Sequence, residues 1–156
     1  HLTLFREAVD GLSSPRLQEI YTGTFDLDAR CHPYIGYQLL GESYKRSQFM
    51  LGLKECYREH GVQPPSNELP DHLAVMLRFL AAVPNREISR EMVVEALMPA
   101  LEGMLREAQQ EEPPEEAKDA GKSLAKPSPY EMVLRALLGW LRRTYGRAYF
   151  EGESRE

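Results

Sequence analysis

Apolar residues recur every three or four positions along most of this chain, a spacing that indicates helices. The stretch from Pro70 to Val83 is apolar around most of its circumference, so we expect it to be the central, most buried helix. No stretch alternates apolar and polar residues between turn signals, and no repeat of fixed period is visible. The sequence therefore predicts an all-α fold, a single-domain helical bundle over residues 1–156.

Capping residues, prolines and glycines predict where the helices begin and end. Ser128 and Glu131 form a capping box that opens a final helix, in which Trp140 and Phe150 belong to the apolar face that docks on the core. Pro99 is expected to kink the helix that Ser89 opens. The other helices are expected to begin at residues 2, 14, 33, 43 and 70, and glycines at 41 and 61 end two of them.

Two segments lack the pattern of a helix. Residues 63–67 contain Pro64 and Pro65, which remove backbone donors and favour an extended chain, so we expect a loop that acts as a hinge. Residues 109–127 are rich in Glu, Pro, Lys and Ala and have no apolar periodicity, which predicts a mobile acidic linker before the last helix. The chain does not begin with Met, so we expect its N-terminal helix to be truncated.

The composition excludes several classes of protein. With 42% hydrophobic residues, 28% charged residues and a net charge of -5, the chain is typical of a soluble globular protein and not of one that binds nucleic acid. No apolar run approaches the ~20 residues that span a bilayer, so no membrane insertion is expected. Cys31 and Cys56 cannot form a disulfide framework, and no secretory signature precedes them, which favours the cytoplasm.

Catalytic and metal-binding patterns are weak. Cys56 and His60 lie one helical turn apart, but two ligands do not make a zinc site. The chain has no glycine-rich phosphate loop, no nucleophile elbow and no His-Glu-x-x-His motif. We therefore predict no metal, no permanently bound cofactor and no enzymatic activity.

The run from Asn67 to Leu73 places polar residues at the start of a long apolar helix pattern. If Pro70 is the first helical residue, Glu68 or Asp71 can cap the exposed backbone donors while His72 bonds a loop carbonyl. Two alternatives stay open: these groups contact a ligand or peptide at a hinge, or Asp71 and His72 transfer protons. Proton transfer is disfavoured because the sequence supplies no third partner.

Aromatic residues form a second candidate site. Tyr34, Tyr37 and Leu40 share a short helix pattern beside Asp26 and Asp28, and such residues either pack in the core or line a groove. If they line a groove, its acidic edge suits an apolar, positively charged peptide.

Four motifs follow one another in a familiar order. They are Tyr21-x-x-Thr24-Phe25-Asp26-Leu27, Tyr37-x-Leu39-Leu40-Gly41-Glu42-Ser43-x-x-Arg46, Glu68-Leu69-Pro70-Asp71-His72-Leu73 and Ser128-Pro129-Tyr130. Together they resemble the molybdenum cofactor assembly chaperones of respiratory nitrate reductase, the delta subunits, within the redox enzyme maturation chaperones. By this resemblance, Glu68, Pro70, Asp71 and His72 belong to a hinge-loop motif for client recognition, and Tyr21, Phe25 and Asp26 to an aromatic-acid motif beside a groove.

The resemblance implies an all-helical cytoplasmic chaperone for an apo molybdoenzyme. Its partner would be the N-terminal segment of the nitrate reductase catalytic subunit, and cofactor-delivery proteins would be further partners. The molybdopterin guanine dinucleotide would belong to the client and not to the chaperone. An upstream helix expected in the family is absent from this sequence. Two other classes stay open, a helical scaffold or subunit without chaperone activity and a small nucleotide- or cofactor-binding enzyme.

Overall fold

A computed structural model describes residues 1–26, 29, 31–65, 67–110 and 128–152. Its described residues form helices and one isolated antiparallel bridge between Tyr34 and His72, with no strand among them. The all-α prediction is confirmed. The helices are α1 (Leu2–Val9), α2 (Ser14–Phe25), α3 (Ile35–Leu40), α4 (Tyr44–Glu59), α5 (Leu73–Ala82), α6 (Arg86–Glu91), the π-helical η1 (Met92–Leu97), α7 (Met98–Gln110) and α8 (Pro129–Gly152).

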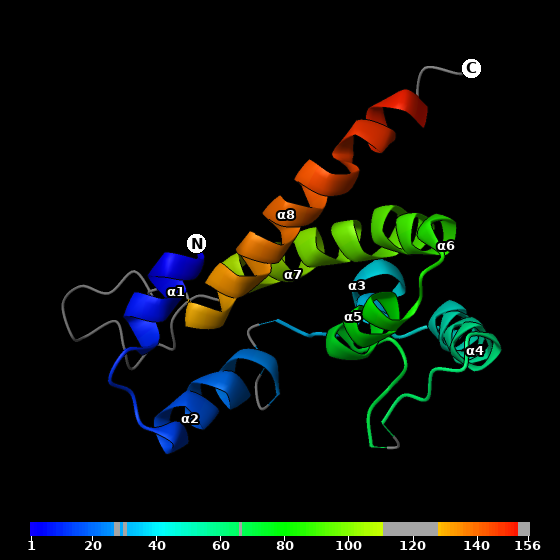
Figure 1. Ribbon diagram of the computed structural model, residues 1–156. Coiled ribbons are helices and arrows are strands. Elements are labelled where there is room, and N and C mark those ends of the chain that lie inside the picture. The colour runs from blue at the N-terminus through cyan, green and yellow to red at the C-terminus, as the bar shows by residue number, and fades with distance from the viewer. Residues whose placement is uncertain (27–28, 30, 66, 111–127, 153–156) are drawn as a thin grey trace.

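The continuous rod of η1 and α7 forms the centre of the molecule. It packs against both α3 and α8, and α1 lies along the beginning of α8 (Figure 1). Leu97, Leu101 and Met104 on this rod have no exposed surface. The expectation that the helix after Pro70 is the most central one is therefore wrong. In α5, Ala74, Arg78 and the last two alanines face solvent, because helices do not enclose it on all sides.

Two helix starts differ from the prediction because another residue provides the cap. The α5 helix begins at Leu73 and not at Pro70, since the His72 side chain accepts the Ala74 N–H. The α6 helix begins at Arg86, before Ser89, because the Asn85 side chain accepts the N–H groups of the next turn. The irregularity expected at Pro99 occurs one turn earlier, as the widened backbone of η1.

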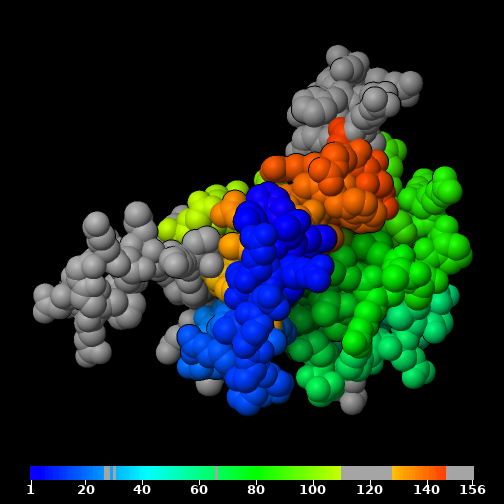
Figure 2. Space-filling view, turned by 60° about the vertical axis from the view of Figure 1, so that its left-hand side comes forward, coloured from blue at the N-terminus to red at the C-terminus, as the bar shows by residue number. Residues whose placement is uncertain are grey.

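The final helix begins with the predicted capping box. The Ser128 N–H donates to the Glu131 carboxylate at 3.0 Å, and the Ser128 hydroxyl accepts the Tyr130 N–H at 3.3 Å. The Ser128 hydroxyl also bonds Thr24 of α2 at 2.7 Å in a buried contact. These bonds join α2 to the start of α8, and Figure 2 shows α1 and α2, in blue, beside α8, in orange.

Other expectations are corrected or lie outside the described residues. Trp140 is 52% exposed, so its place on the core face is wrong. The predicted linker does not begin at residue 109, because Gln109 and Gln110 are the last residues of α7. Residues 111–127, Asp28 of the predicted acidic edge and the Phe150 side chain lie outside the described part of the chain. Residues 63–65 are non-helical as predicted, and their action as a hinge stays a prediction.

Candidate functional site

The Asp71 carboxylate lies at a buried junction of three helices. Its side chain has 0% exposure, and Arg46 of α4 donates from Nε to Oδ2 at 2.9 Å. Gly36 of α3 lies against the same oxygen, since a Cβ at this glycine would be only 2.8 Å from it. The other carboxylate oxygen, Oδ1, has no hydrogen-bond partner among the described residues. Asp71 therefore fixes α3, α4 and the start of α5 together and is not available on the surface.

His72 is the cap of α5 in place of the expected acidic residue. Its Nδ1 accepts the Ala74 N–H at 3.1 Å, which requires the neutral ring with its proton on Nε2. Nε2 lies 4.0 Å from the Glu68 carboxylate. Burial lowers the pKa of His72, and it outweighs the carboxylates of Glu68 and Asp71, which act in the opposite direction. A neutral capping histidine explains the Asp-His sequence without proton transfer.

The last residues of the loop before α5 are held from two sides, by α4 and by the segment at the start of α3. The buried Tyr57 hydroxyl of α4 donates to the Pro70 carbonyl at 2.8 Å. On the other side, the Ile35 N–H donates to the Asp71 carbonyl and the Leu73 N–H to the Pro33 carbonyl, both at 2.8 Å. This short bridge places the Tyr34 ring against His72, with centroids 5.3 Å apart. Pro70 and His72 are consequently buried, and Glu68 remains half-exposed.

Five of the predicted site residues gather on one surface, here called the aromatic-acidic surface: Tyr21, Phe25, Asp26, Tyr34 and Glu68. The Tyr34 hydroxyl donates to Glu68 at 3.3 Å, and the Tyr21 and Phe25 rings are 5.1 Å apart. Burial, and then the charge of Glu68, raises the pKa of both tyrosines, with a smaller contribution from Asp26. Aromatic rings and carboxylates from α2 and two loops are thus brought together.

The tyrosines of this surface are accessible. Tyr21 is 44% exposed, Tyr34 is half-buried and Asp26 is exposed. Behind them, the Tyr130 ring of α8 packs edge-on against Tyr21 at 5.4 Å. The surface therefore offers apolar ring faces that rest on a packed aromatic cluster and have carboxylates at their margin.

Tyr37 and Leu40 are not part of this surface. Tyr37 lines a polar cleft of ≈ 640 Å³ together with Gln38 of α3 and Glu107 of α7. Glu107 accepts from the Gln38 side chain at 2.6 Å and from the His32 N–H at 2.9 Å, and its other oxygen lies 2.5 Å from His32 Nδ1. Leu40 is half-buried at the end of α3. The three residues expected to form one groove wall therefore have different neighbours: Tyr34 contacts Glu68 and His72, Tyr37 lines the polar cleft, and Leu40 is half-buried.

Sequence reasoning missed Arg46 and Glu107. The helical pattern of α4 places Arg46 on the solvent side, yet its side chain is only 15% exposed and its guanidinium lies over the rings of Tyr34 and Tyr37, at 5.5 and 5.7 Å. Asp71, at the start of a long apolar helix pattern, is the signal that could have indicated such a partner, because a carboxylate buried there needs a cation or hydrogen-bond donors. Glu107 has no comparable signal, since its partners are about 70 residues away in sequence.

Other classes of site find no support in the described residues. No group of three or more His, Cys, Asp or Glu side chains in these residues is arranged to bind a metal ion. Cys31 and Cys56 are not joined in a disulfide. The helices within the described ranges include none with the length and apolar character needed to cross a bilayer.

Comparison with known proteins decides the family. The family described as "Nitrate reductase delta subunit" matches residues 1–112. This chain belongs to that family. A probable nitrate reductase molybdenum cofactor assembly chaperone NarJ from Bacillus subtilis is 38% identical over 78 residues, which are 50% of this chain and 42% of the relative.

Two further relatives of this delta-subunit chain are similar over shorter stretches. The NarJ chaperone of Escherichia coli K12 is 39% identical over 70 residues, 45% of this chain and 30% of the relative. The nitrate reductase-like protein NarX of Mycobacterium tuberculosis is 41% identical over 63 residues, 40% of this chain and 10% of the relative. The matches thus span less than half the length of these curated relatives. No solved structure matches this chain.

Proposed function

We propose that this chain is a system-specific chaperone that binds the N-terminal segment of the apo nitrate reductase catalytic subunit in the cytoplasm. It assists insertion of the molybdenum cofactor and assembly of the enzyme complex and catalyses no reaction. The molybdopterin guanine dinucleotide belongs to the client, and cofactor-delivery proteins are further partners. Membership of the delta subunit family and the names of the relatives support this proposal.

The aromatic-acidic surface is the observation that carries the proposal. Tyr21 and Tyr34 offer ring faces that bury apolar side chains, and Asp26 and Glu68 at their margin attract Lys or Arg. Such a surface suits a segment that is apolar and positively charged. Asp71 and His72 act indirectly, because their buried side chains position Tyr34 and Glu68 and do not reach the client.

Calorimetry with a synthetic peptide of the client's N-terminal segment tests this proposal. The double variant Asp26→Asn and Glu68→Gln retains the shape of both side chains and removes both charges. We expect it to bind the peptide about tenfold more weakly, with a smaller salt dependence, because two charge-assisted contacts are lost. Tyr21→Ala should have a similar effect through lost apolar contact.

The matched control is Glu55→Gln on α4, which removes an exposed carboxylate that pairs with Arg58 away from this surface. It should leave the peptide affinity unchanged. Unchanged affinity of the Asp26/Glu68 double variant, with circular dichroism showing a folded protein, would place the client elsewhere.

A further inference from the structure

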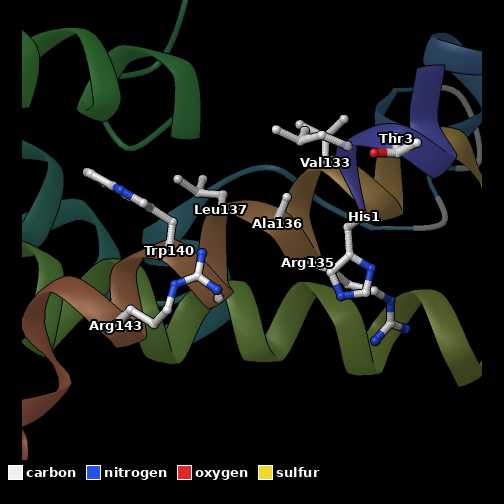
Figure 3. A pocket seen from close by; sticks show the side chains of 10 residues that line it. His1, Thr3, Val133, Arg135, Ala136, Leu137, Trp140 and Arg143 are labelled. Atoms are coloured by element: carbon white, nitrogen blue, oxygen red, sulfur yellow. The ribbon is translucent and has the colours of Figure 1, made fainter.

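A groove of ≈ 670 Å³ lies between α1 and α8, apart from the aromatic-acidic surface. Leu2 and Thr3 line its α1 side, and α8 supplies most of the other side (Figure 3). Leu2 is 61% exposed there, and Trp140 is 52% exposed. Large apolar side chains are thus accessible in a concave part of the surface, which is typical of an interaction site.

The α8 side of the groove has the spacing of a helix-packing stripe. Val133, Ala136, Leu137 and Trp140 recur at i, i+3, i+4 and i+7 and follow one another along the helix in Figure 3. The adjacent face of α8 is already packed, because Leu134, Leu138 and Leu141 are buried in the core, and Leu137 of the stripe partly packs on that core as well. The stripe is therefore a second apolar face of the same helix, and none of its four residues is fully buried.

The groove carries positive charge at both ends of this stripe. Arg135 and Arg143 line it, and neither forms an ion pair or hydrogen bond with a described residue. Their neighbour Arg142 points elsewhere and pairs with Glu102 of α7 at 2.6 Å. Arg135 and Arg143 are eight positions apart, about 12 Å along a helix axis.

We propose that this groove binds an acidic amphipathic helix of a partner protein. The partner's apolar face packs on Val133, Leu137 and Trp140, and two carboxylates about two turns apart meet Arg135 and Arg143. The site goes beyond the proposed client surface, since its charge has the opposite sign. A positively charged client tail suits the aromatic-acidic surface, whereas the groove suits a different segment.

A lipid surface is the alternative occupant, because exposed Trp, Leu and Arg residues are typical of helices that lie at a membrane interface. Two observations favour a helix. The apolar stripe lies in a groove, where a flat bilayer does not reach, and the chain as a whole carries a net charge of -5, which opposes binding to anionic lipids.

The fluorescence of Trp140 reports directly on the groove, because it is the only tryptophan in the chain. The probe is a designed helical peptide of about 18 residues with Leu at i, i+4 and i+7 and Glu two turns apart beside them. A matched peptide carries Lys in place of Glu. We expect a saturable blue shift of the emission with the Glu peptide and an affinity at least about fivefold lower for the Lys peptide.

Variants on neighbouring residues of α8 separate the groove from the rest of the surface. The double variant Arg135→Gln and Arg143→Gln should weaken binding of the Glu peptide about fivefold, and Arg142→Gln should not change it. No blue shift with the Glu peptide, equal binding of both peptides, or wild-type affinity of the Arg135/Arg143 double variant would overturn the proposal.

Three other occupants have outcomes of their own. The groove begins at His1, and we expect the N-terminal helix to be truncated, so a segment that precedes His1 is one of them. A chain extended upstream of His1 that no longer binds the Glu peptide would assign the groove to that segment and overturn the proposal. A blue shift with anionic phosphatidylserine vesicles but not with the peptide would assign the groove to membranes and overturn the proposal. Dimerisation that depends on concentration in the ultracentrifuge, and that the Trp140→Ala variant abolishes, would also overturn the proposal. The occupant would then be a second copy of this chain. Asp26→Asn and Glu68→Gln leave the groove intact, so failure of the client-binding proposal would not alter these results.

Discussion

Two polar junctions attach α3 to its neighbours, and they differ in their contact with water. The Arg46–Asp71 pair is nearly dry, with side-chain exposures of 15% and 0%. The His32–Glu107 pair beside the polar cleft is wetter, at 41% and 27%. A buried charge that loses its partner destabilises the fold far more than a charge that water can reach. We therefore expect the fold to depend more on the Arg46–Asp71 pair than on the His32–Glu107 pair. The side chains of the His32–Glu107 pair remain in contact with water beside the cleft.

Removal of one partner from each junction should give the largest difference. Arg46→Ala leaves the buried Asp71 charge unpaired and is expected to lower the free energy of unfolding by about 3–5 kcal/mol. Glu107→Gln retains the shape of its side chain, and solvent can replace the lost bonds, so a loss of about 1 kcal/mol or less is expected. Urea unfolding followed by circular dichroism measures both. Equal losses in the two variants would contradict the assignment of Asp71 as the structural centre.

Substituting alanine for a helical glycine beside each junction compares how tightly the two junctions are packed. A Cβ at Gly36 would lie 2.8 Å from Asp71 Oδ2, 3.0 Å from the Phe49 ring and 3.1 Å from Arg46 Cγ. Since Asp71 is fully buried and Arg46 is paired with it, these atoms cannot move away without breaking that pair, and Gly36→Ala should destabilise the protein by about 1–3 kcal/mol.

Gly103→Ala is the matched control. Its Cβ would lie 2.7 Å from Gln38 Oε1, the end of a flexible side chain at the edge of the cleft. Moving that side chain disturbs its bonds to Glu107 and the His32 carbonyl, but water in the cleft can replace them. Alanine favours the helix by about 1 kcal/mol, so a net change near zero is expected. Melting temperatures of the two variants test this contrast. A Gly103→Ala protein as unstable as Gly36→Ala would mean that the cleft is as tightly packed as the dry junction.

Local signals in the sequence predict most of the fold, and long-range contacts explain where prediction fails. The capping box at Ser128 and the stops at Gly41 and Gly61, both with positive φ, are encoded within a few residues. The start of α5 is not, because Pro70 and Asp71 are drawn into the Tyr57 and Arg46 contacts, and His72 becomes the cap.

The candidate site was also predictable only where its residues are close in the sequence. Tyr21 and Phe25 lie on one helix at a spacing that the sequence reveals, but their proximity to Tyr34 and Glu68 depends on how α2 packs. Tyr37 follows Tyr34 by three positions and nevertheless lines the polar cleft, whereas Tyr34 bonds Glu68. Spacing along a short helix therefore predicted the residue types at the surface and not their grouping.

The smallest expected effect is a pH dependence that comes from His72, the residue next to Asp71 of the dry junction. Burial lowers the pKa of His72 below the ordinary value of 6.5, so the folded state binds fewer protons at this ring than the unfolded state does. Its contribution to stability is complete above pH 6.5 and is lost as the pH falls towards the lowered pKa, when protonation also removes the Nδ1 cap of α5.

His72→Asn retains a capping acceptor but does not titrate, so its stability should decline less on acidification than that of the wild type. His72→Ala should cost about 1 kcal/mol at neutral pH through loss of the cap. Urea unfolding at several pH values between about 5 and 8 measures these differences. Parallel pH profiles for wild type and His72→Asn would show that the ring is protonated equally in the folded and unfolded states, and His72 would then have no part in the acid response.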